Sequence, residues 1–178
     1  MKRRHWIFAG AATAAAAAGL AWQRHREGSQ VQSGAVASDP VLADFWQMRF
    51  DQPDGRVLDM ATLRGQPLLL NFWGTWCPPC IKEMPDLDRF ARRFGAKGWR
   101  VVGLAVDNPK AVREFLARTP VSYAIGLAGF EGSELSLRLG NTRSGLPFTV
   151  AFDRQGRVSQ RKAGVTTPEE LERWAHAS

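Results

Sequence analysis

The chain has 178 residues and a mass of 19.7 kDa, which is the size of one ordinary domain. Its content of 44% hydrophobic and 23% charged residues allows a buried core and excludes disorder set by composition. The net charge of +7 is uneven: residues 1–30 carry five Lys/Arg and one acid, a net +4, whereas the other 148 carry 19 basic and 16 acidic side chains, a net +3. No basic run is interleaved with aromatic residues, so nucleic acid is not an expected partner.

Residues 1–26 have the pattern of a signal anchor or a signal peptide. Three basic residues follow the initial methionine, and an alanine-rich stretch without acids, Lys or Arg covers residues 5–23. The 17 residues from Trp6 to Trp22 would span about 25 Å as a helix, close to the minimum for crossing a bilayer. The basic start and the aromatic ends predict a cytoplasmic N-terminus with residues 5–23 in the membrane, and pairs of small residues leave cleavage open. An alanine-rich soluble helix is the alternative.

The next segment, residues 27–43, is polar, small and aperiodic. It predicts a linker between the membrane and a domain at residues 44–178. With the N-terminus in the cytoplasm and one crossing of the membrane, this domain is expected outside the cytoplasm.

The periodicity of the domain predicts alternating strands and helices. Residues 45–50 alternate as a strand, and a turn at residues 53–55 lets residues 56–59 pair back as a hairpin. Further strands are expected at residues 68–73, 99–106 and 121–125, and helices at residues 78–94, 109–118 and 131–139. A hairpin of residues 148–152 and 157–163 precedes a last helix, with Thr167 as its N-cap. This order predicts an α/β, three-layer domain with a mixed central sheet.

The chemistry concentrates at Trp76-Cys77-Pro78-Pro79-Cys80, between a buried strand and the first long helix. A zinc site would need two more ligands, and the histidines lie only at positions 5, 25 and 176. Covalent haem attachment would need a histidine at position 81, where the chain has isoleucine. No metal or other cofactor is therefore expected. An inert structural disulfide would close a very small loop and add little stability.

A redox-active pair is the remaining interpretation of the two cysteines. Cys77 would lie exposed at the helix N-terminus, where unpaired N–H groups and the helix dipole stabilise a thiolate. Cys80, one turn further on and covered by the helix, would resolve a mixed disulfide. Cys77 is thus the predicted nucleophile and Cys80 the predicted resolving thiol.

The stretch Asn71–Pro85, with the sequence NFWGTWCPPCIKEMP, resembles the active-site segment of TlpA/ResA-like thioredoxins, which are exported, membrane-tethered thiol–disulfide oxidoreductases. The resemblance covers residues 42–176 and implies a thioredoxin-like fold with an N-terminal β-hairpin and a strand–helix unit inserted at residues 121–139. It also implies that Pro147 is cis and faces the disulfide, while Leu146 offers its backbone to an extended substrate. Trp76 and Pro78 are expected to border this substrate site.

Two polar positions bear on proton transfer. Glu83 matches a glutamate that ResA-like members carry three residues after the second cysteine, and it is a candidate proton acceptor for Cys80. The alternative is an exposed glutamate in the first helical turn, favoured by the helix dipole. Thioredoxins proper carry an aspartate six residues before the first cysteine, but this chain has Asn71 there. Trp73, by contrast, is expected in the core.

The resemblance favours a reductase of disulfides in exported proteins, such as apocytochrome c or a copper-centre protein, supplied with electrons by a DsbD/CcdA-type membrane protein. The two prolines between the cysteines favour the same direction, because they lack N–H donors for a Cys77 thiolate. The implied location is the bacterial inner membrane, facing the periplasm, or the periplasm itself after cleavage. An oxidant or isomerase, and a non-enzymatic Cu(I)-binding chaperone, are the alternatives. A peroxiredoxin is disfavoured because Gly74 stands where that class has threonine.

Overall fold

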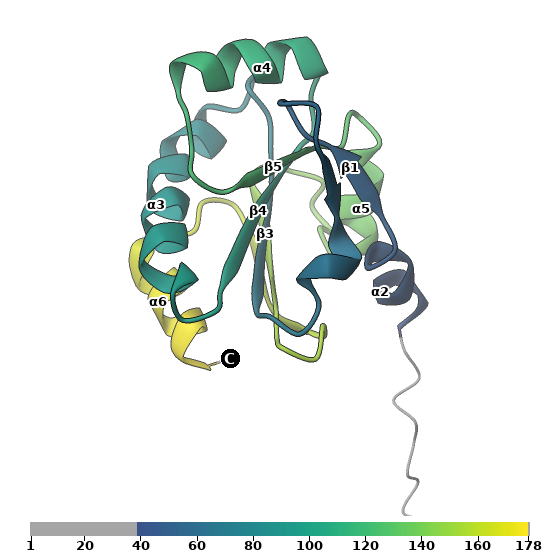
Figure 1. The fold of residues 1–178 in the computed structure, drawn as a ribbon, viewed down its shortest axis with the longest axis vertical. Coiled ribbons are helices and arrows are strands. Elements are labelled where there is room, and N and C mark those ends of the chain that lie inside the picture. The colour runs from purple at the N-terminus through teal and green to yellow at the C-terminus, as the bar shows by residue number, and fades with distance from the viewer. Residues whose placement is uncertain (1–38, 178) are drawn as a thin grey trace, which may run out of the picture. The chain divides into compact units, whose positions relative to one another are not determined.

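The computed structural model describes residues 39–177, and the predictions for residues 1–26 and for the linker up to residue 38 lie outside this part. Within it, one sheet of seven strands is covered by helices on both faces (Figure 1). The strands are β1 (Arg49–Asp51), β2 (Val57–Asp59), β3 (Leu68–Trp73), β4 (Arg100–Ala105), β5 (Ala124–Leu127), β6 (Phe148–Phe152) and β7 (Val158–Ala163). The helices are α2 (Pro40–Phe45), α3 (Pro78–Gly95), α4 (Pro109–Arg118), α5 (Gly132–Arg138) and α6 (Pro168–Ala177), with a 3₁₀ turn at Met60–Leu63. The α/β, three-layer prediction is confirmed.

The sheet is mixed, as predicted. Its strand order is β2-β1-β5-β4-β3-β6-β7, in which β3, β4 and β5 run parallel and the other neighbouring pairs are antiparallel. Helices α3 and α4 make the two crossovers between the parallel strands, as in other βαβ units. Because parallel strands end at the same edge of a sheet, the segments that follow β3, β4 and β5 meet at one edge.

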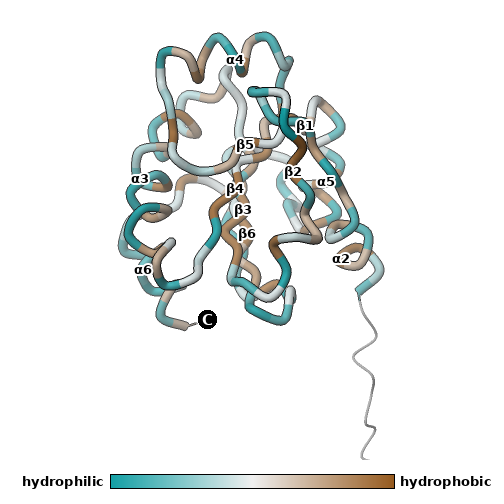
Figure 2. The backbone as a smooth tube through the Cα atoms, viewed as in Figure 1, coloured by the Kyte–Doolittle hydropathy of each residue, from teal (hydrophilic) through white to brown (hydrophobic). Residues whose placement is uncertain are grey.

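Strand β3 lies at the centre of the sheet, and all six of its residues are buried. Leu68, Leu70 and Phe72 pack into a cluster with the side chains of α2 and α5. Leu69 and Trp73 pack into a second cluster with α3, α4 and α6 on the opposite face. The hydropathy of the chain follows this arrangement, since the apolar segments gather in the middle strands (Figure 2).

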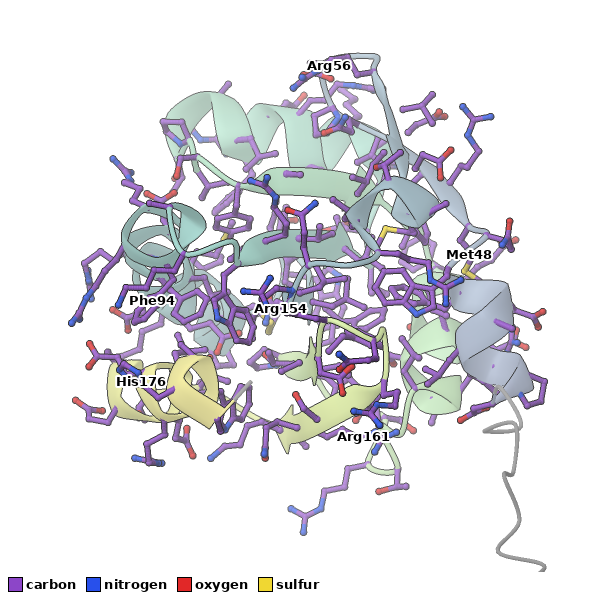
Figure 3. All side chains as sticks on the ribbon, turned by 60° about the horizontal axis from the view of Figure 1, so that its bottom comes forward. Met48, Arg56, Phe94, Arg154, Arg161 and His176 are labelled. Atoms are coloured by element: carbon purple, nitrogen blue, oxygen red, sulfur yellow. A yellow bond between two sulfur atoms is a disulfide. The ribbon has the colours of Figure 1, made fainter. Side chains whose placement is uncertain are left out.

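Helices α3 and α6 pack against each other on one face of the sheet (Figure 1). Phe94 in α3 and His176 in α6 meet edge to face, with ring centroids 6.2 Å apart (Figure 3). One turn back along α3, Phe90 stacks on Phe94 with centroids 4.7 Å apart and meets Trp99 at 5.4 Å. These contacts hold the C-terminal half of α3 in place, and with it the N-terminal half that carries both cysteines.

The N-terminal hairpin is present, but the prediction of a strand at residues 45–50 is wrong for residues 45–48. Residues 40–45 form α2, with the Asp39 side chain accepting a hydrogen bond from Val41 N at 3.0 Å, and β1 begins only at Arg49. The rings of Phe45 and Trp46 both pack on Phe152, with centroids 5.1 and 5.2 Å away. A strand would send these neighbours to opposite faces, whereas the helix end buries both. Helix α2 therefore begins within the segment predicted as a linker, residues 27–43.

The inserted strand–helix unit is also present, with a shorter strand than predicted. Strand β5 starts at Ala124 instead of residue 121. The carboxylate of Asp88 on α3 accepts hydrogen bonds from Ser122 N and Ser122 Oγ, both at 2.6 Å. This contact draws the segment before β5 toward α3, and so keeps it out of the sheet.

No helix within residues 39–177 combines the length and the apolar character needed to cross a bilayer. The stretch predicted to lie in the membrane, residues 5–23, falls outside the described residues.

We expect Trp46→Phe to lower the free energy of unfolding by about 1–3 kcal/mol. Trp46 Nε1 donates a buried hydrogen bond to the carbonyl of Gly156 at 3.0 Å, and phenylalanine removes the donor and leaves a small void. Urea denaturation followed by circular dichroism measures the change. Val57→Ala, at an exposed position of the β1–β2 hairpin, is the control and should change stability by less than about 0.5 kcal/mol. Equal losses for both variants would contradict the anchoring role of the indole.

Candidate active site

The two cysteines form a disulfide at the junction of β3 and α3. The sulfurs are 2.00 Å apart and the Cα atoms 5.3 Å apart. Cys77 is the N-cap of α3, Pro78 and Pro79 take the first two helical positions, and Cys80 follows. The Cys80 N–H donates to Cys77 Sγ at 3.3 Å. The prolines have no N–H, so this is the one backbone donor within residues 77–80 directed at the Cys77 sulfur.

The prediction that Cys77 lies exposed is wrong, because both cysteines are buried, although Cys77 is the more exposed of the two. Cys80 is fully buried, Cys77 is 4% exposed and Trp76 is 59% exposed, while Trp73 lies in the core as predicted. Pro78 is exposed on the outer face of the turn. The sulfur pair therefore lies just beneath the surface, with Cys77 as the cysteine nearer to solvent.

Trp76 is exposed yet held in place. Its Nε1 donates to the Val106 carbonyl at 3.2 Å, and its ring lies over Gly74. A Cβ at Gly74 would come within 2.8 Å of the indole nitrogen, so a larger residue there would displace the ring. The indole is thus a pre-positioned apolar surface beside the disulfide.

The loop that leads to Cys77 is fixed by a buried carboxylate. Asp107, which follows β4 and is 5% exposed, accepts hydrogen bonds from Thr75 N at 2.8 Å and Thr75 Oγ1 at 2.6 Å. Its other oxygen accepts from Asn108 N at 2.6 Å. Asp107 therefore ties the segment before the disulfide to the neighbouring parallel strand.

Glu83 is buried beneath the disulfide, with 1% of its surface exposed. One carboxylate oxygen accepts from Asn71 Nδ2 at 2.7 Å, and the other accepts from Thr166 N at 2.8 Å and Thr166 Oγ1 at 3.1 Å. Asn71 Nδ2 also donates to Thr149 Oγ1 at 3.0 Å. The alternative of an exposed glutamate is therefore wrong, because the side chain turns inward to three polar partners.

Burial raises the pKa of the Glu83 carboxyl above its ordinary value, although the hydrogen bonds from Thr166 and Asn71 act in the opposite direction. Glu83 lies three residues after Cys80 on α3, so the two side chains share one face of the helix. A carboxyl with a raised pKa beside a thiol is suited to accept and return its proton.

The residue that precedes β6 is a cis proline, as predicted: the Leu146–Pro147 peptide bond is cis. In the antiparallel pairing of β6 with β3, Phe148 lies opposite Phe72, which brings Pro147 level with the end of β3 where the disulfide segment begins. The Pro147 carbonyl accepts from Gly164 N at 2.9 Å. Leu146 is half-buried, and within residues 39–177 neither its N–H nor its C=O has a hydrogen-bond partner. A free peptide edge is therefore available next to the cis bond.

Asn141 holds the loop that carries this edge. It is 1% exposed, and its Nδ2 donates to the Gly145 carbonyl at 2.9 Å and to Ser136 Oγ on α5 at 3.2 Å. The loop before the cis proline is thus fastened to the inserted helix.

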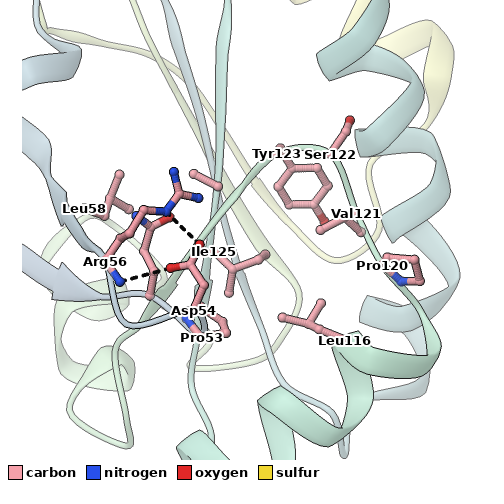
Figure 4. A pocket seen from close by; sticks show the side chains of 12 residues that line it. Pro53, Asp54, Arg56, Leu58, Leu116, Pro120, Val121, Ser122, Tyr123 and Ile125 are labelled. Carbon is pink, nitrogen blue, oxygen red and sulfur yellow. Dashed lines mark hydrogen bonds and ion pairs between the residues drawn. The ribbon is translucent and has the colours of Figure 1, made fainter.

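A cavity of about 570 Å³ opens elsewhere, between the turn of the N-terminal hairpin and the segment before β5 (Figure 4). Arg56 pairs with Asp54 at its rim, 2.7 Å apart, and Tyr123 and Ile125 form part of its wall. None of the residues predicted for the site lines this cavity. The disulfide site and this cavity are therefore separate features of the domain.

The sequence did not reveal three of these residues: Asp107, Asn141 and Thr166. Asp107 had a usable signal, since it directly follows a parallel strand next to β3 and such strands end at one edge. Neither Thr166 nor Asn141 carried a signal in the sequence that pointed to the site. Thr166 is separated from Glu83 by 83 residues, and only the folded sheet brings them together.

We expect the stability conferred by Glu83 to fall as pH rises. The folded protein binds the Glu83 proton more tightly than the unfolded chain, whose reference value is 4.5, so this contribution is present below that pH and is lost as pH rises through the folded-state pKa. Glu83→Gln removes the titration. The free energy of unfolding of the parent minus that of the variant should therefore decrease from pH 4 toward neutrality in urea denaturation. Both proteins are measured oxidised, so that no thiol titrates, and a difference that is flat or rises with pH would contradict the assignment.

Comparisons with known proteins agree with this geometry. The family model described as Redoxin matches residues 24–175. The thiol-disulfide oxidoreductase ResA of Bacillus cereus is 31% identical over 145 residues, which cover 80% of this chain and 76% of the relative. The thiol:disulfide interchange protein DsbE of Yersinia pestis is 41% identical over 133 residues, which cover 73% of this chain and 65% of the relative.

Solved structures show the same fold. A thiol:disulfide interchange protein of Chlorobium tepidum matches with a TM-score of 0.66 at 25% identity, over 73% of this chain and 91% of its own. The structure of MTB DsbF matches with a TM-score of 0.65 at 26% identity, over 78% of this chain and 97% of its own. With a disulfide capping a helix at the end of a central strand and a cis proline at the start of the neighbouring one, the chain belongs to the Redoxin family, in its TlpA/ResA-like group of thiol–disulfide oxidoreductases.

Proposed function

We propose that this protein reduces disulfides in exported polypeptides, with Cys77 as the nucleophile and Cys80 as the resolving thiol. The observation that carries the proposal is the position of Cys77: it is the more exposed cysteine, at the N-terminus of α3, and the unpaired peptide edge of Leu146 lies at the same end of the sheet. An extended substrate segment can form hydrogen bonds with that edge while its disulfide lies on Cys77, with Trp76 and Pro78 bordering it.

The reaction starts from the reduced pair. The Cys77 thiolate attacks one sulfur of the substrate disulfide, the substrate S–S bond breaks, and the released substrate thiolate takes up a proton. Cys80 then loses its proton to Glu83 and attacks Cys77 Sγ. This second exchange forms the Cys77–Cys80 disulfide seen in the structure, and the second substrate sulfur leaves as a thiolate that takes up a proton from water. Two electrons have passed from the protein to the substrate, and Glu83 returns its proton to solvent.

The direction of electron flow is inferred from the donors at Cys77. An N-cap side chain ordinarily accepts from the N–H groups of the second and third helical positions. Here the second position is Pro79, so the Cys80 N–H remains as the donor at 3.3 Å. A Cys77 thiolate with one donor fewer is less stabilised, and a less stabilised dithiol form is a better reductant.

The proposed reductase needs a supply of electrons and a place where disulfides persist. The pattern of residues 1–26 supports a bacterial inner-membrane protein that faces the periplasm, or a periplasmic protein if the segment is cleaved. A DsbD/CcdA-type membrane protein is the proposed donor. Apocytochrome c or a copper-centre protein is the proposed substrate, by resemblance to the family.

Cys80→Ser should accumulate mixed disulfides with polypeptide substrates in intact cells, because Cys77 can still attack and nothing resolves the product. Cys77→Ser, the matched control, should accumulate none, since Cys80 is fully buried. Non-reducing electrophoresis after acid quenching detects the adducts. Adducts in the Cys77 variant but not in the Cys80 variant would reverse the assignment.

The equilibrium reduction potential against glutathione should be more negative than about −200 mV, whereas a value near the −120 mV of strong oxidants would exclude the reductase direction. Pro79→Ala restores an N–H at the second helical position and should shift the potential upward by about 20–30 mV, the equivalent of one added hydrogen bond of about 1 kcal/mol. Pro78→Ala is the control, because an N–H at the first position is not aimed at an N-cap side chain. Equal shifts in both variants would contradict the donor argument.

A further inference from the structure

A highly exposed phenylalanine lies at the same edge of the sheet as the disulfide. Phe130 is 72% exposed, the largest exposure among the big apolar side chains of residues 39–177. It follows β5, whereas Cys77 follows β3, and both strands run parallel to β4 between them. Two strand spacings, about 10 Å, separate the ends of β3 and β5.

Phe130 is joined to the disulfide surface by a short chain of contacts. The Trp76 indole beside Cys77 donates to the Val106 carbonyl at 3.2 Å. The other side of Val106 touches the first turn of α5, so closely that a Cβ at Gly132 would lie 3.0 Å from Val106 Cγ2. Phe130 stands in the turn just before Gly132, where Ser133 N donates to its carbonyl at 3.1 Å. Trp76 and the segment that carries Phe130 and Gly132 therefore both lie against Val106.

The far side of Phe130 borders a hollow of about 420 Å³. Leu127, Ala128 and Pro109 supply apolar lining, and Asp51 and Glu131 are among the polar lining residues. Pro109 begins α4 three residues after Val106, so one wall of the hollow comes from the segment that follows β4. It is open to solvent and large enough for one or two apolar side chains.

We propose that Phe130 and this hollow bind an apolar side chain of the same polypeptide whose disulfide reacts at Cys77. The inference rests on the proposed function and adds to it a specificity-determining residue in the inserted strand–helix unit. A substrate that covers Cys77 and Trp76 can extend along this edge, and burying an apolar side chain against Phe130 removes both from water. At about 3.3 Å per residue, an extended segment reaches the hollow about three to five residues from its reacting cysteine.

The inference can be tested with short synthetic peptides. The protein is the full 178-residue chain in detergent, and every variant also carries Cys80→Ser. Each peptide carries one cysteine as a mixed disulfide with 2-thiopyridine. The Cys77 thiolate attacks the peptide sulfur, the bond to the pyridyl sulfur breaks, and pyridine-2-thione leaves with a proton and is followed by its absorbance. One peptide has leucines three to five residues before the cysteine, one has them after it, and one has serines at both places.

One of the two leucine peptides should react about five- to tenfold faster than the serine peptide, the gain expected from burying one large apolar side chain. Phe130→Ser should remove most of this advantage, and Phe130→Leu should keep a large part of it. Leu137→Ser is the matched control, because Leu137 is 45% exposed at the other end of α5 and should leave the advantage intact. The rate with 2,2′-dithiodipyridine should be the same in all variants.

The inference is overturned if neither leucine peptide is favoured, if the advantage survives Phe130→Ser, or if Leu137→Ser removes it equally. A Cys80→Ser protein that does not react even with 2,2′-dithiodipyridine would contradict Cys77 as the nucleophile. That outcome would overturn the proposed function, and this inference with it.

Discussion

The burial of β3 on both faces is the constraint on which the rest of the site depends. Five of its six side chains are apolar and divide between the two core clusters. Asn71 is the exception: it lies within the strand, fully buried, and its side chain turns toward α3. A buried amide needs partners, because leaving its donors unpaired costs about 1–3 kcal/mol. Glu83 and Thr149 supply them.

This requirement links four parts of the chain under the disulfide. Asn71 in β3 holds Glu83 in α3, Thr149 in β6 receives the second amide proton, and Thr166 in the loop before α6 holds the other carboxylate oxygen. Glu83 is thus kept inward by hydrogen bonds from β3 and from the loop before α6, at a depth where burial raises the pKa of its carboxyl. Thioredoxins proper carry an aspartate at the position of Asn71. In this chain Asn71 instead orients the carboxylate of Glu83 through a hydrogen bond.

The sequence predicted correctly those elements in which the hydrophobic pattern of the segment itself determines the secondary structure. The apolar run of β3, the helical spacing of α3 and the bounds of α4 were predicted within a residue or two, because each carries a strong period of its own. The predictions failed where a contact with a residue far away in the sequence determines the local structure. Phe45 and Trp46 alternate like strand residues, yet Phe152, more than 100 residues away, makes burial of both rings more favourable.

The residues of the site also fall into those that the sequence predicts and those that depend on distant contacts. Cys77 and Cys80 could be placed from the sequence, because a helix N-cap is a local feature, and the cis bond of Pro147 was implied by the resemblance to the family. The inward turn of Glu83 could not, since its partner Thr166 is joined to it only through the closing hairpin and the loop that follows β7. Asp107 lies between these cases: the parallel pairing of β3 with β4 is enough to bring it to the disulfide loop, once that pairing is known.

The order of the strands also explains how one sheet edge can serve chemistry and recognition separately. Counting across the sheet, β6 brings the free peptide edge of Leu146, β3 brings the disulfide, β4 brings Asp107 and the carbonyl that anchors Trp76, and β5 brings Phe130. The first two must keep fixed geometry, because sulfur exchange and backbone pairing allow little displacement. Phe130 does not need such a fixed geometry, because apolar contact is non-directional. Placing it in the inserted unit, two strands from the sulfurs, lets substrate preference vary without disturbing Cys77, Cys80 or the carboxylate beneath them.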